Sequence, residues 1–273
     1  MLIAQISDLH IRLPGQKAYR VVETDAYLPP VVDALNRLDP RPDCVVITGD
    51  LTDFGRPAEY AHLRHLLAPL QLPFFLLPGN HDDRQALADA FPEHAYLRTD
   101  GPFVQYAVEQ YPVRILALDT VVPFKGHGAL CAERLHWLET ELAREPGRPT
   151  LIAMHHPPFK TGIAHMDAIG LLSGAPELEA LVGRHPNIER IICGHLHRTI
   201  YARFGGTVAS CCPGTAHQIA LDLRPAGPSA FVMEPPGYQL HTWQGGALTT
   251  HSAVLGEFPG PYPFHEEGAL IDE

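Results

Sequence analysis

The architecture of this chain follows from the segment Leu2-Ile3-Ala4-Gln5-Ile6-Ser7-Asp8-Leu9-His10. Its apolar first part predicts a short buried strand, and polar residues follow directly where that strand ends. Five later runs predict buried strands in the same way: Cys44–Thr48, Phe74–Leu77, Arg114–Leu118, Thr150–Met154 and Ile188–Cys193. Segments with helical patterns lie between them, at Pro29–Leu38, Pro57–Leu70 and Cys131–Arg144. This alternation predicts an α/β fold with helices layered over sheet.

The pattern changes after Arg198, where strands are expected to follow one another between Gly/Pro turns. The expected strands are Thr199–Phe204, Thr207–Ser210, Gln218–Leu223, Ala230–Met233, Gln239–Trp243 and Ala247–Ala253. They can form a second sheet packed on the first, a small protruding subdomain, or both. We therefore expect a single domain over residues 1–273, with a cap or dimerisation subregion within about 199–255. The Pro/Gly-rich tail from Gly256 is expected to lie along the surface.

The charge and composition exclude several classes of partner. The net charge is −11, from 20 basic and 31 acidic residues, and no Lys/Arg cluster is present, which argues against binding of duplex nucleic acid. No apolar stretch is long enough for a membrane span, and the N-terminus lacks the features of a signal peptide. The five cysteines are an odd number in a long chain, which favours reduced thiols in the cytoplasm. An anionic substrate would need a local source of positive charge, such as bound metal.

Residues that can bind metal follow the expected strands of the first 200 residues. They are Asp8-Leu9-His10, Gly49-Asp50, Gly79-Asn80-His81-Asp82, His155-His156 and Gly194-His195-Leu196-His197. In open α/β sheets, ligands bind outside the carboxyl ends of the strands. Five loops from one sheet edge can therefore converge on one pocket.

The spacing within these motifs suits metal binding. Asp-x-His and His-x-His place two side chains on the same side of an extended segment. Carboxylate, amide and imidazole donors together suit Zn²⁺, Mn²⁺ or Fe²⁺, whereas Ca²⁺ prefers oxygen alone. Each motif taken alone can be read as a turn or a helix cap plus a surface histidine. Together and in this order they predict a dinuclear metal site.

The full set of motifs resembles the calcineurin-like metallophosphoesterase superfamily over about residues 1–200. Within it, the chain looks like the bacterial class III phosphodiesterases, which include glycerophosphodiester and cyclic-nucleotide phosphodiesterases. The segment Pro213-Gly214-Thr215-Ala216-His217-Gln218 is similar to the glycerophosphodiesterase subgroup. The resemblance implies a two-sheet α/β sandwich with a β-rich C-terminal portion.

The resemblance also implies a ligand set for two divalent transition-metal ions, which would be Fe, Mn or Zn. One ion would be held by Asp8, His10 and His197, and the other by Asn80, His155 and His195. Asp50 would bridge the two ions. The family motif uses the first histidine of the His155-His156 pair, and His156 is the alternative.

The catalytic roles implied by the family fall on the third motif and on one later histidine. A hydroxide bridging the metals would attack phosphorus, and His81 would contact the phosphate and assist the leaving oxygen. Asp82 would orient His81, or alternatively cap the following helix. Asn80, His81 and His217 are the expected substrate contacts. Asp53, near the second motif, is interpreted as a turn residue.

We therefore expect hydrolysis of small phosphodiesters, either glycerophosphodiesters or 3',5'-cyclic nucleotides. The motif loops contain few arginines, which favours a diester over a doubly charged monoester. The alternatives are a phosphomonoesterase or protein phosphatase on the same metal core, and a non-catalytic scaffold of the same fold. Exposed strand edges in the C-terminal portion predict a homo-oligomer.

Overall fold

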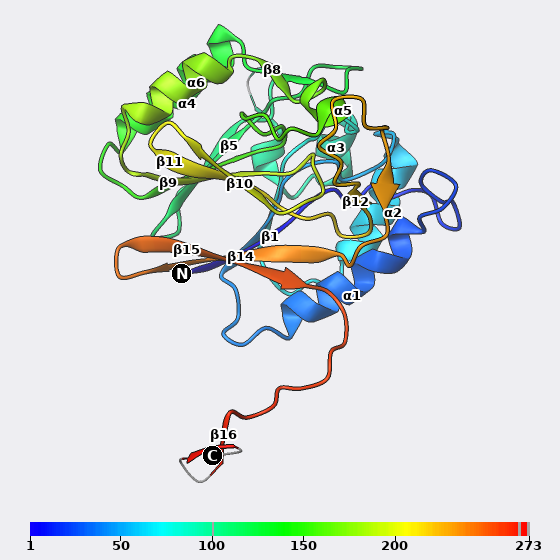
Figure 1. Ribbon diagram of the computed structural model, residues 1–273. Helices are drawn as coiled ribbons and strands as arrows, with labels where there is room; N and C mark the ends of the chain where they lie inside the picture. The colour runs from blue at the N-terminus through cyan, green and yellow to red at the C-terminus, as the bar shows by residue number, and fades with distance from the viewer. Residues whose placement is uncertain (100, 267–268, 272–273) are drawn as a thin grey trace.

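The computed structural model describes residues 1–99, 101–266 and 269–271, and it contains two large sheets with helices on their outer faces (Figure 1). The first sheet has the order β15-β14-β1-β2-β3. Its parallel strands are β1 (Leu2–Ile6), β2 (Cys44–Ile47) and β3 (Phe74–Leu76). Two antiparallel strands, β14 (Gly237–Gln244) and β15 (Ala247–Val254), complete it.

The second sheet has the order β10-β11-β9-β7-β5-β4. Its central strands are parallel, namely β11 (Thr207–Cys211), β9 (Ile188–Cys193), β7 (Thr150–Met154) and β5 (Arg114–Leu118). The two edge strands, β10 (Ile200–Phe204) and β4 (Tyr106–Val108), run antiparallel to their neighbours. This arrangement confirms the expected two-sheet α/β sandwich.

The helices divide between the two sheets. Three helices pack on the first sheet: α1 (Thr24–Asn36), α2 (Pro57–Leu67) and α3 (Arg84–Ala90). Two helices pack on the second sheet: α4 (Ala132–Arg144) and α6 (Ala175–Gly183). The remaining short elements are η1 (Ala95–Leu97), α5 (Ala164–Asp167), the pair β6 (Gly128–Ala129) and β8 (Leu171–Ser173), and the pair β12 (Gln218–Ile219) and β13 (Phe231–Val232).

Alternation along the strands of the second sheet explains why the sandwich forms. In β7, Leu151 and Ala153 pack in the core shared with the first sheet. Their neighbours Ile152 and Met154 pack with residues of α4 and α6. Because successive side chains of a strand point to opposite faces, β7 is covered by a sheet on one side and by helices on the other. Residues 151–154 of β7 are accordingly all apolar.

Within the described residues, the segment after Arg198 mainly extends the two large sheets and forms only two-stranded sheets of its own. β10 and β11 extend the second sheet, whereas β14 and β15 extend the first. The expected strands Gln218–Leu223 and Ala230–Met233 are reduced to the two-residue strands β12 and β13. Leu221 and Leu223 are exposed, because neither large sheet covers this part of the segment.

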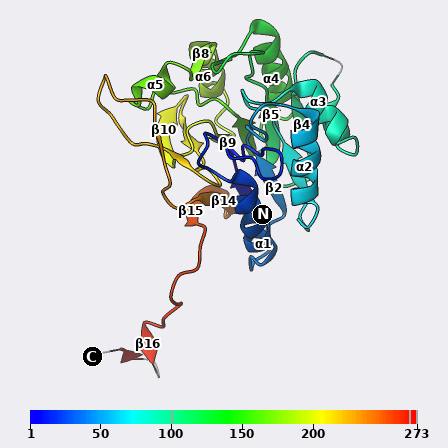
Figure 2. The same ribbon diagram turned by 90° about the vertical axis from the view of Figure 1, so that its right-hand side faces the viewer.

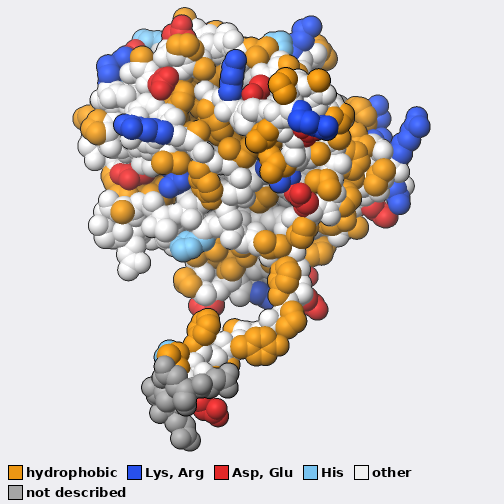
Figure 3. All heavy atoms as spheres, viewed as in Figure 1, with side chains coloured by type: hydrophobic (Ala, Val, Ile, Leu, Met, Phe, Trp, Pro, Cys, Tyr) orange, Lys and Arg blue, Asp and Glu red, His pale blue; other side chains and the backbone are white. Residues whose placement is uncertain are grey.

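The C-terminal arm, from Gly256 onward, projects away from the body instead of lying on it, so the expectation of a surface-bound tail was wrong (Figures 1 and 2). It ends in a small hairpin of β16 (His265–Glu266) and β17 (Ala269–Leu270). Prolines in the arm favour an extended conformation. Hydrophobic side chains line it in full view of solvent (Figure 3).

Candidate metal centre

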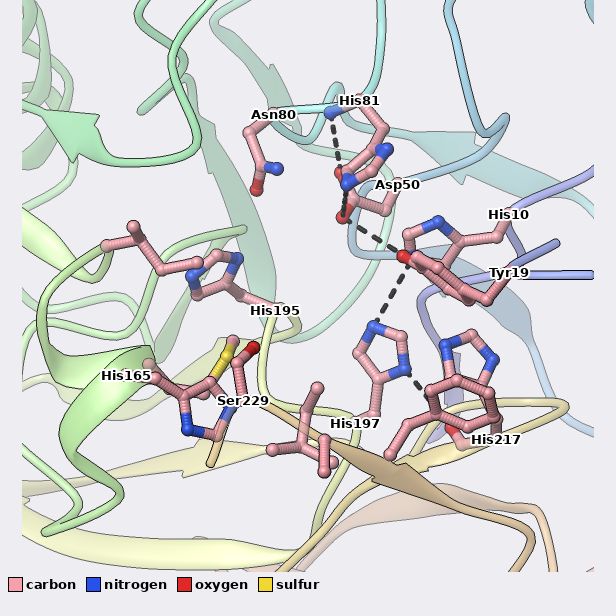
Figure 4. A pocket seen from close by; sticks show the side chains of 15 residues that line it. His10, Tyr19, Asp50, Asn80, His81, His165, His195, His197, His217 and Ser229 are labelled. Atoms are coloured by element: carbon pink, nitrogen blue, oxygen red, sulfur yellow. Dashed lines mark hydrogen bonds and ion pairs between the residues drawn. The ribbon is translucent and has the colours of Figure 1, made fainter. Parts of the chain in front are cut away.

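The expected ligands meet at the carboxyl ends of parallel strands from both sheets. Asp8 and His10 follow β1, Asp50 follows β2, Asn80 follows β3, His155 follows β7, and His195 and His197 follow β9. Most of these side chains line a cavity of about 490 Å³, as do His81 and His217 (Figure 4). The convergence predicted from the sequence is therefore present.

Glycines allow these loops to approach one another closely. A Cβ atom on Gly79 would lie 2.2 Å from Oδ1 of Asp50, and one on Gly194 would lie 2.1 Å from Oγ of Ser7. A Cβ on Gly49 would lie 2.5 Å from Nδ1 of His155. No side chain fits at such distances, so these positions require glycine.

The backbone at the site is strained. Positive φ angles occur at five of the ligand residues: Asp8 (57°), His10 (47°), Asp50 (49°), His195 (70°) and His197 (47°). Non-glycine residues rarely adopt this left-handed conformation, which costs of order 1–3 kcal/mol per residue. Such strain persists where the surrounding structure enforces it, and it is typical of functional sites.

One cluster of donors consists of Asp8, His10, Asp50 and His197, whose ligand atoms lie within 4.8 Å of one another. Nε2 of His10 lies 3.2 Å from Nε2 of His197 and 3.5 Å from Oδ2 of Asp50. Nε2 of His197 lies 3.4 Å from Oδ1 of Asp8. Two imidazole nitrogens and two carboxylates thus face a single point.

A second cluster lies on the other side of Asp50. Nε2 of His155 is 3.3 Å from Oδ1 of Asp50 and 3.1 Å from Oδ1 of Asn80. The His195 ring lies beside His155, with the ring centroids 5.2 Å apart. The two oxygens of Asp50 therefore face different clusters, as a bridging ligand requires.

The choice between His155 and His156 is not decided by proximity alone, because both lie within ligand range of His195. Both ring nitrogens of His156 already have partners, Thr120 Oγ1 at 2.8 Å and the Gly126 carbonyl at 3.2 Å. His155 instead directs Nε2 at Asp50 and Asn80. These contacts favour His155 as the ligand and leave His156 supporting the loop.

The electrostatics of the site suit a bound cation. Burial, above all, raises the pKa of Asp8 to about 6, and burial lowers the pKa of His197 to about 3. Burial and the nearby His155 also hold the pKa of His195 well below its ordinary value. Among the described residues, Asp8 Oδ2 and His195 Nε2 are buried without a hydrogen-bond partner. The neutral imidazoles of His195 and His197 and the unpaired oxygen of Asp8 are donors that divalent transition metals need, so these residues fit such ions.

His81 lies at the open side of this site, with its side chain 30% exposed. Its Nδ1 donates to the Asp53 carbonyl at 2.8 Å, which leaves Nε2 facing Asp50 at 4.0 Å. The backbone N–H of His81 also donates to Asp50 Oδ1 at 2.9 Å. The imidazole is therefore fixed in direction and remains open to exchange protons with solvent.

Asp82 has neither of the two contacts expected from the sequence. Its carboxylate accepts hydrogen bonds from the Gly79 N–H at 2.8 Å, the Leu51 N–H at 3.0 Å and the Tyr60 hydroxyl at 2.8 Å. None of its hydrogen bonds within the described residues reaches His81, and the cap of α3 is Asp83. Asp82 thus ties the loop after β2 to the loop after β3, because buried amide groups there need an acceptor.

Asp53, which was interpreted as a turn residue, also contacts His10 and Arg12 through its side chain. Its Oδ1 lies 3.3 Å from Nδ1 of His10, and its Oδ2 accepts a hydrogen bond from Arg12 at 3.0 Å. A carboxylate on the outer nitrogen of a histidine ligand fixes the ring's orientation. The sequence carried no signal for this contact, because His10 and Asp53 lie in different motif loops.

His217 reaches the cavity as expected. Its ring centroid is 4.6 Å from that of His197 and 5.4 Å from that of Tyr19. Burial, followed by the neighbouring His197, lowers the pKa of His217 to about 2. Its backbone carbonyl also accepts a hydrogen bond from Nδ1 of His197 at 3.1 Å. This residue is a neutral polar group on the cavity wall.

Two donor clusters that share an aspartate, at the carboxyl edge of a two-sheet sandwich, are the architecture of a metallophosphoesterase. Comparison with known proteins agrees with this class. The family model described as calcineurin-like phosphoesterase matches residues 1–199. The chain belongs to the calcineurin-like phosphoesterase family, as its motifs predicted.

Relatives and structural neighbours point the same way. The chain is 39% identical to the probable glycerophosphodiester phosphodiesterase GpdQ of Arcobacter nitrofigilis, over 100% of both chains. It is 32% identical to the 3',5'-cyclic adenosine monophosphate phosphodiesterase CpdA of Escherichia coli K12, over 93% of this chain and 90% of the relative. A dimetal phosphatase from Danio rerio superposes with a TM-score of 0.67 at 15% identity, over 94% of this chain and 96% of that one. That last likeness concerns the fold alone.

Proposed function

We propose that this protein is a metal-dependent phosphodiesterase that hydrolyses glycerophosphodiesters or 3',5'-cyclic nucleotides. The observation that carries the proposal is Asp50, whose two oxygens face two separate donor clusters. No Lys or Arg occurs among the residues lining the cavity, all of which are described. A cavity without basic side chains suits a singly charged diester better than a doubly charged monoester. The named activities of the relatives agree with this reading.

Seven residues would hold the two ions. We infer that Asp8, His10 and His197 hold one ion, Asn80, His155 and His195 hold the other, and Asp50 bridges them. The mixed oxygen and nitrogen donors suit Fe, Mn or Zn. When bound, such ions supply the positive charge that this acidic protein lacks, polarise a phosphoryl oxygen and lower the pKa of bound water.

His81 would serve the leaving group. Its Nδ1 is committed to the Asp53 carbonyl, so a proton for the leaving oxygen comes from Nε2. The exposed part of the ring lets solvent replace that proton after each turnover. Asn80 and His217 would contact the phosphate, and Asp82 would hold the loop that positions His81.

A substrate panel tests the activity. With defined Mn²⁺, Zn²⁺ or Fe²⁺, we expect kcat/KM for bis(p-nitrophenyl) phosphate to be well above that for p-nitrophenyl phosphate. Glycerophosphoethanolamine and 3',5'-cyclic AMP then separate the two diester classes. A preference for the monoester would instead support a phosphatase. Absence of all turnover, with less than one tightly bound ion per chain, would support a scaffold.

We propose in addition that the protein is a homo-oligomer. Phe258, Tyr262 and Phe264 on the C-terminal arm are 63%, 74% and 83% exposed, and the arm begins beside the edge strand β15. Exposed aromatic side chains of this kind are common where protein surfaces meet. Sedimentation of the intact chain should give a multiple of 30.0 kDa, and Tyr262→Ser with Phe264→Ser should lower it. A monomeric intact chain would contradict the proposal.

The cytoplasm is the compartment we propose. All five cysteines are free thiols, and four of them are buried, which suits a reducing environment. Within the described residues, no helix combines the length and apolar character that crossing a bilayer demands. Fractionation of cells that express the protein would test this placement.

A further inference from the structure

The chain contains three lysines, Lys17, Lys125 and Lys160, and all three are exposed. Each lies in a loop that follows the carboxyl end of a strand: Lys17 between β1 and α1, Lys125 between β5 and β6, and Lys160 between β7 and α5. The candidate metal ligands lie at the same sheet edge. Every lysine of this acidic chain is therefore on the side of the molecule where the cavity opens, which we call the cavity face.

Contacts bring the three loops to the mouth of the cavity. Tyr19 of the first loop lines the cavity. In the second loop, the carbonyl oxygen of Gly126 lies 3.2 Å from Nε2 of His156. The third loop leads into α5, whose His165 also lines the cavity. Both α5 and the blue loop before α1 lie on the right-hand side of Figure 1. The lysines are thus near the opening, although none of these three described residues lines the cavity itself.

These loops are basic, although the chain as a whole has a net charge of −11. Residues 11–23, 120–127 and 155–163 contain five basic residues and one acidic residue. Two of the five lie near carboxylates, because Arg12 pairs with Asp53 and Lys17 lies 4.0 Å from Glu23. Charges more than about 8 Å apart are largely screened at physiological ionic strength. An anionic surface that approaches the cavity face therefore meets local positive charge.

Each lysine has an aromatic residue within two positions along the chain, namely Tyr19, Phe124 or Phe159. Phe124 is 100% exposed and has a positive φ of 62°. Bulky residues rarely adopt this left-handed conformation, so the loop holds the ring in solvent at a cost in conformational energy. Aromatic rings and lysine ammonium groups are the side chains that anchor proteins at a membrane–water interface.

Further apolar side chains extend this surface. Val21 and Met233 are exposed and line a surface groove together with Lys17. A Cβ atom added to Gly162, in the loop before α5, would lie 3.5 Å from Cδ2 of Leu223, which is also exposed. Single exposed apolar residues are normal, whereas a group of them on one face marks an interaction surface.

A lipid bilayer fits this surface better than a protein or a nucleic acid does. Lysine is depleted at interfaces between proteins, where arginine is the preferred basic residue. Single-stranded nucleic acid is bound by rings that stack on bases, and Val21, Leu223 and Met233 have no ring. At a bilayer, aliphatic and aromatic groups enter the headgroup region while ammonium groups reach the lipid phosphates.

We propose that the cavity face docks on a lipid bilayer that contains anionic headgroups. Phe124 and Tyr19 would enter the headgroup region, and Lys125 and Lys160 would contact lipid phosphates. Docking of this kind requires no membrane-spanning helix. The proposal goes beyond the phosphodiesterase function, because binding to a bilayer can be measured without turnover.

Vesicle sedimentation with the intact, metal-loaded protein tests the proposal. Vesicles of phosphatidylcholine are compared with vesicles of an equal mixture of phosphatidylcholine and phosphatidylglycerol. We expect the protein to sediment with the mixed vesicles, and added salt to weaken this binding. Lys17→Ala, Lys125→Ala and Lys160→Ala together should lower the affinity about a hundredfold, since each lysine near an anionic bilayer contributes about fivefold. Phe124→Ser alone should lower it about tenfold.

The matched control removes the same charge from the opposite sheet edge. Arg37, Arg144 and Arg184 are exposed and precede the amino ends of β2, β7 and β9. Replacing all three with alanine should leave vesicle binding as in the wild type. Both triple variants should hydrolyse bis(p-nitrophenyl) phosphate in solution like the wild type, because none of the six described residues lines the cavity. Normal hydrolysis shows that the lysine variant is folded.

An introduced tryptophan tests the orientation. Phe124→Trp should shift its fluorescence emission to shorter wavelength on mixed vesicles, because the ring enters a less polar region. Gly147→Trp, before β7 at the opposite edge, should show no shift, and an added Cβ there has nothing within 4 Å.

Failure to sediment with the mixed vesicles would overturn the proposal, as would equal loss of binding in the two triple variants. A shift for Gly147→Trp without one for Phe124→Trp would overturn it by placing another face on the bilayer. Preferential binding of a single-stranded oligonucleotide, or self-association that Phe124→Ser abolishes, would assign the surface to a nucleic acid or to a second copy instead. Vesicle binding without phosphodiester hydrolysis would uphold this proposal and count only against the proposed function.

Discussion

The backbone and both carboxylate oxygens of Asp50 are held in place by their surroundings. Its backbone has a positive φ of 49°, its Oδ1 accepts the His81 N–H, and both carboxylate oxygens face histidines. Replacing it with alanine removes the carboxylate whose two oxygens face His10 and His155. We expect Asp50→Ala to hold less than two ions per chain by elemental analysis and to reduce bis(p-nitrophenyl) phosphate hydrolysis to background. Near-normal activity would refute the dinuclear arrangement.

His81 contacts the cluster without belonging to it. Because its Nε2 is 4.0 Å from Asp50 and its Nδ1 is committed elsewhere, its loss should affect proton transfer more than metal binding. We expect His81→Ala to lower kcat by about 10²–10⁴-fold. Metal content, measured on the same preparation, should stay normal. A variant that loses metal would make His81 a ligand.

Asp53 acts through His10. Without its carboxylate, the His10 ring loses the contact at Nδ1 that sets its direction. We expect Asp53→Asn to weaken metal affinity by about 10–100-fold, the usual effect of removing such a partner. Titration of the metal-free protein with Mn²⁺, followed by activity, measures this. Asp33→Asn, at an exposed position of α1, is the matched control and should titrate like the wild type.

At the scale of elements, the strands were predictable because burial on both faces makes them continuous apolar runs. Helix α1 was predicted over Pro29–Leu38, yet it begins at Thr24, ends at Asn36 and contains both Pro29 and Pro30. Short elements such as α3 and β4 have too few residues for a periodic pattern. The segment around Leu221 was predicted as a strand because its apolar residues were expected to be buried, whereas Leu221 is exposed.

The candidate site likewise contains residues that the sequence predicted and residues that it did not. The convergence of the seven expected donors was predictable because each follows a strand end in a motif of two to four residues. Asp53 was missed, because what defines it is its contact with His10 from a different loop. The positive φ at Asp8 and His195 was also invisible, since Asp and His adopt this conformation more often than most residues but still only in a minority of cases. Local order in the sequence therefore predicts which side chains converge, but not their partners from distant segments.

The loops after β2 and β3 must touch, and Gly79 makes this contact possible. An added Cβ at Gly79 would lie 2.2 Å from the N and Oδ1 atoms of Asp50, so Gly79→Ala must displace one loop. We expect this variant to lose bound metal and to unfold at a lower temperature. Gly147→Ala is the control, because nothing lies within 4 Å of its added Cβ. Equal metal content in the two variants would contradict this reading of the loops.

At the scale of the whole molecule, buried polar contacts join the two sheets. Gln5 of β1 donates from Nε2 to the Cys193 carbonyl of β9 at 3.0 Å, and His241 of β14 lies 3.1 Å from Gln5 Oε1. The other ring nitrogen of His241 lies 2.8 Å from the Thr250 hydroxyl. Burial, aided by the positive charge of Arg190, lowers the pKa of His241 from its ordinary 6.5 to about 3. The folded protein therefore favours the neutral imidazole.

This shift predicts how acid destabilises the fold. Between pH 6.5 and about 3, the unfolded chain binds a proton at His241 and the folded protein does not, so stability falls as pH falls through this window. Above pH 6.5 the residue is neutral in both states and has no effect. The contribution is about 1.4 kcal/mol per pH unit. We expect the unfolding free energy of the wild type to drop more steeply between about pH 5.5 and 4.5 than that of His241→Gln, measured by urea denaturation.

His241→Gln is the informative variant because glutamine can both donate to Gln5 and accept from Thr250, yet it cannot be protonated. The buried histidines of the metal centre also titrate in the unfolded chain, but they do so equally in both proteins, and their effect cancels in the comparison. The difference in slope therefore belongs to one residue that lies outside the metal centre. Parallel pH profiles would mean that His241 is protonated in the folded state, and that the contact between the sheets tolerates charge.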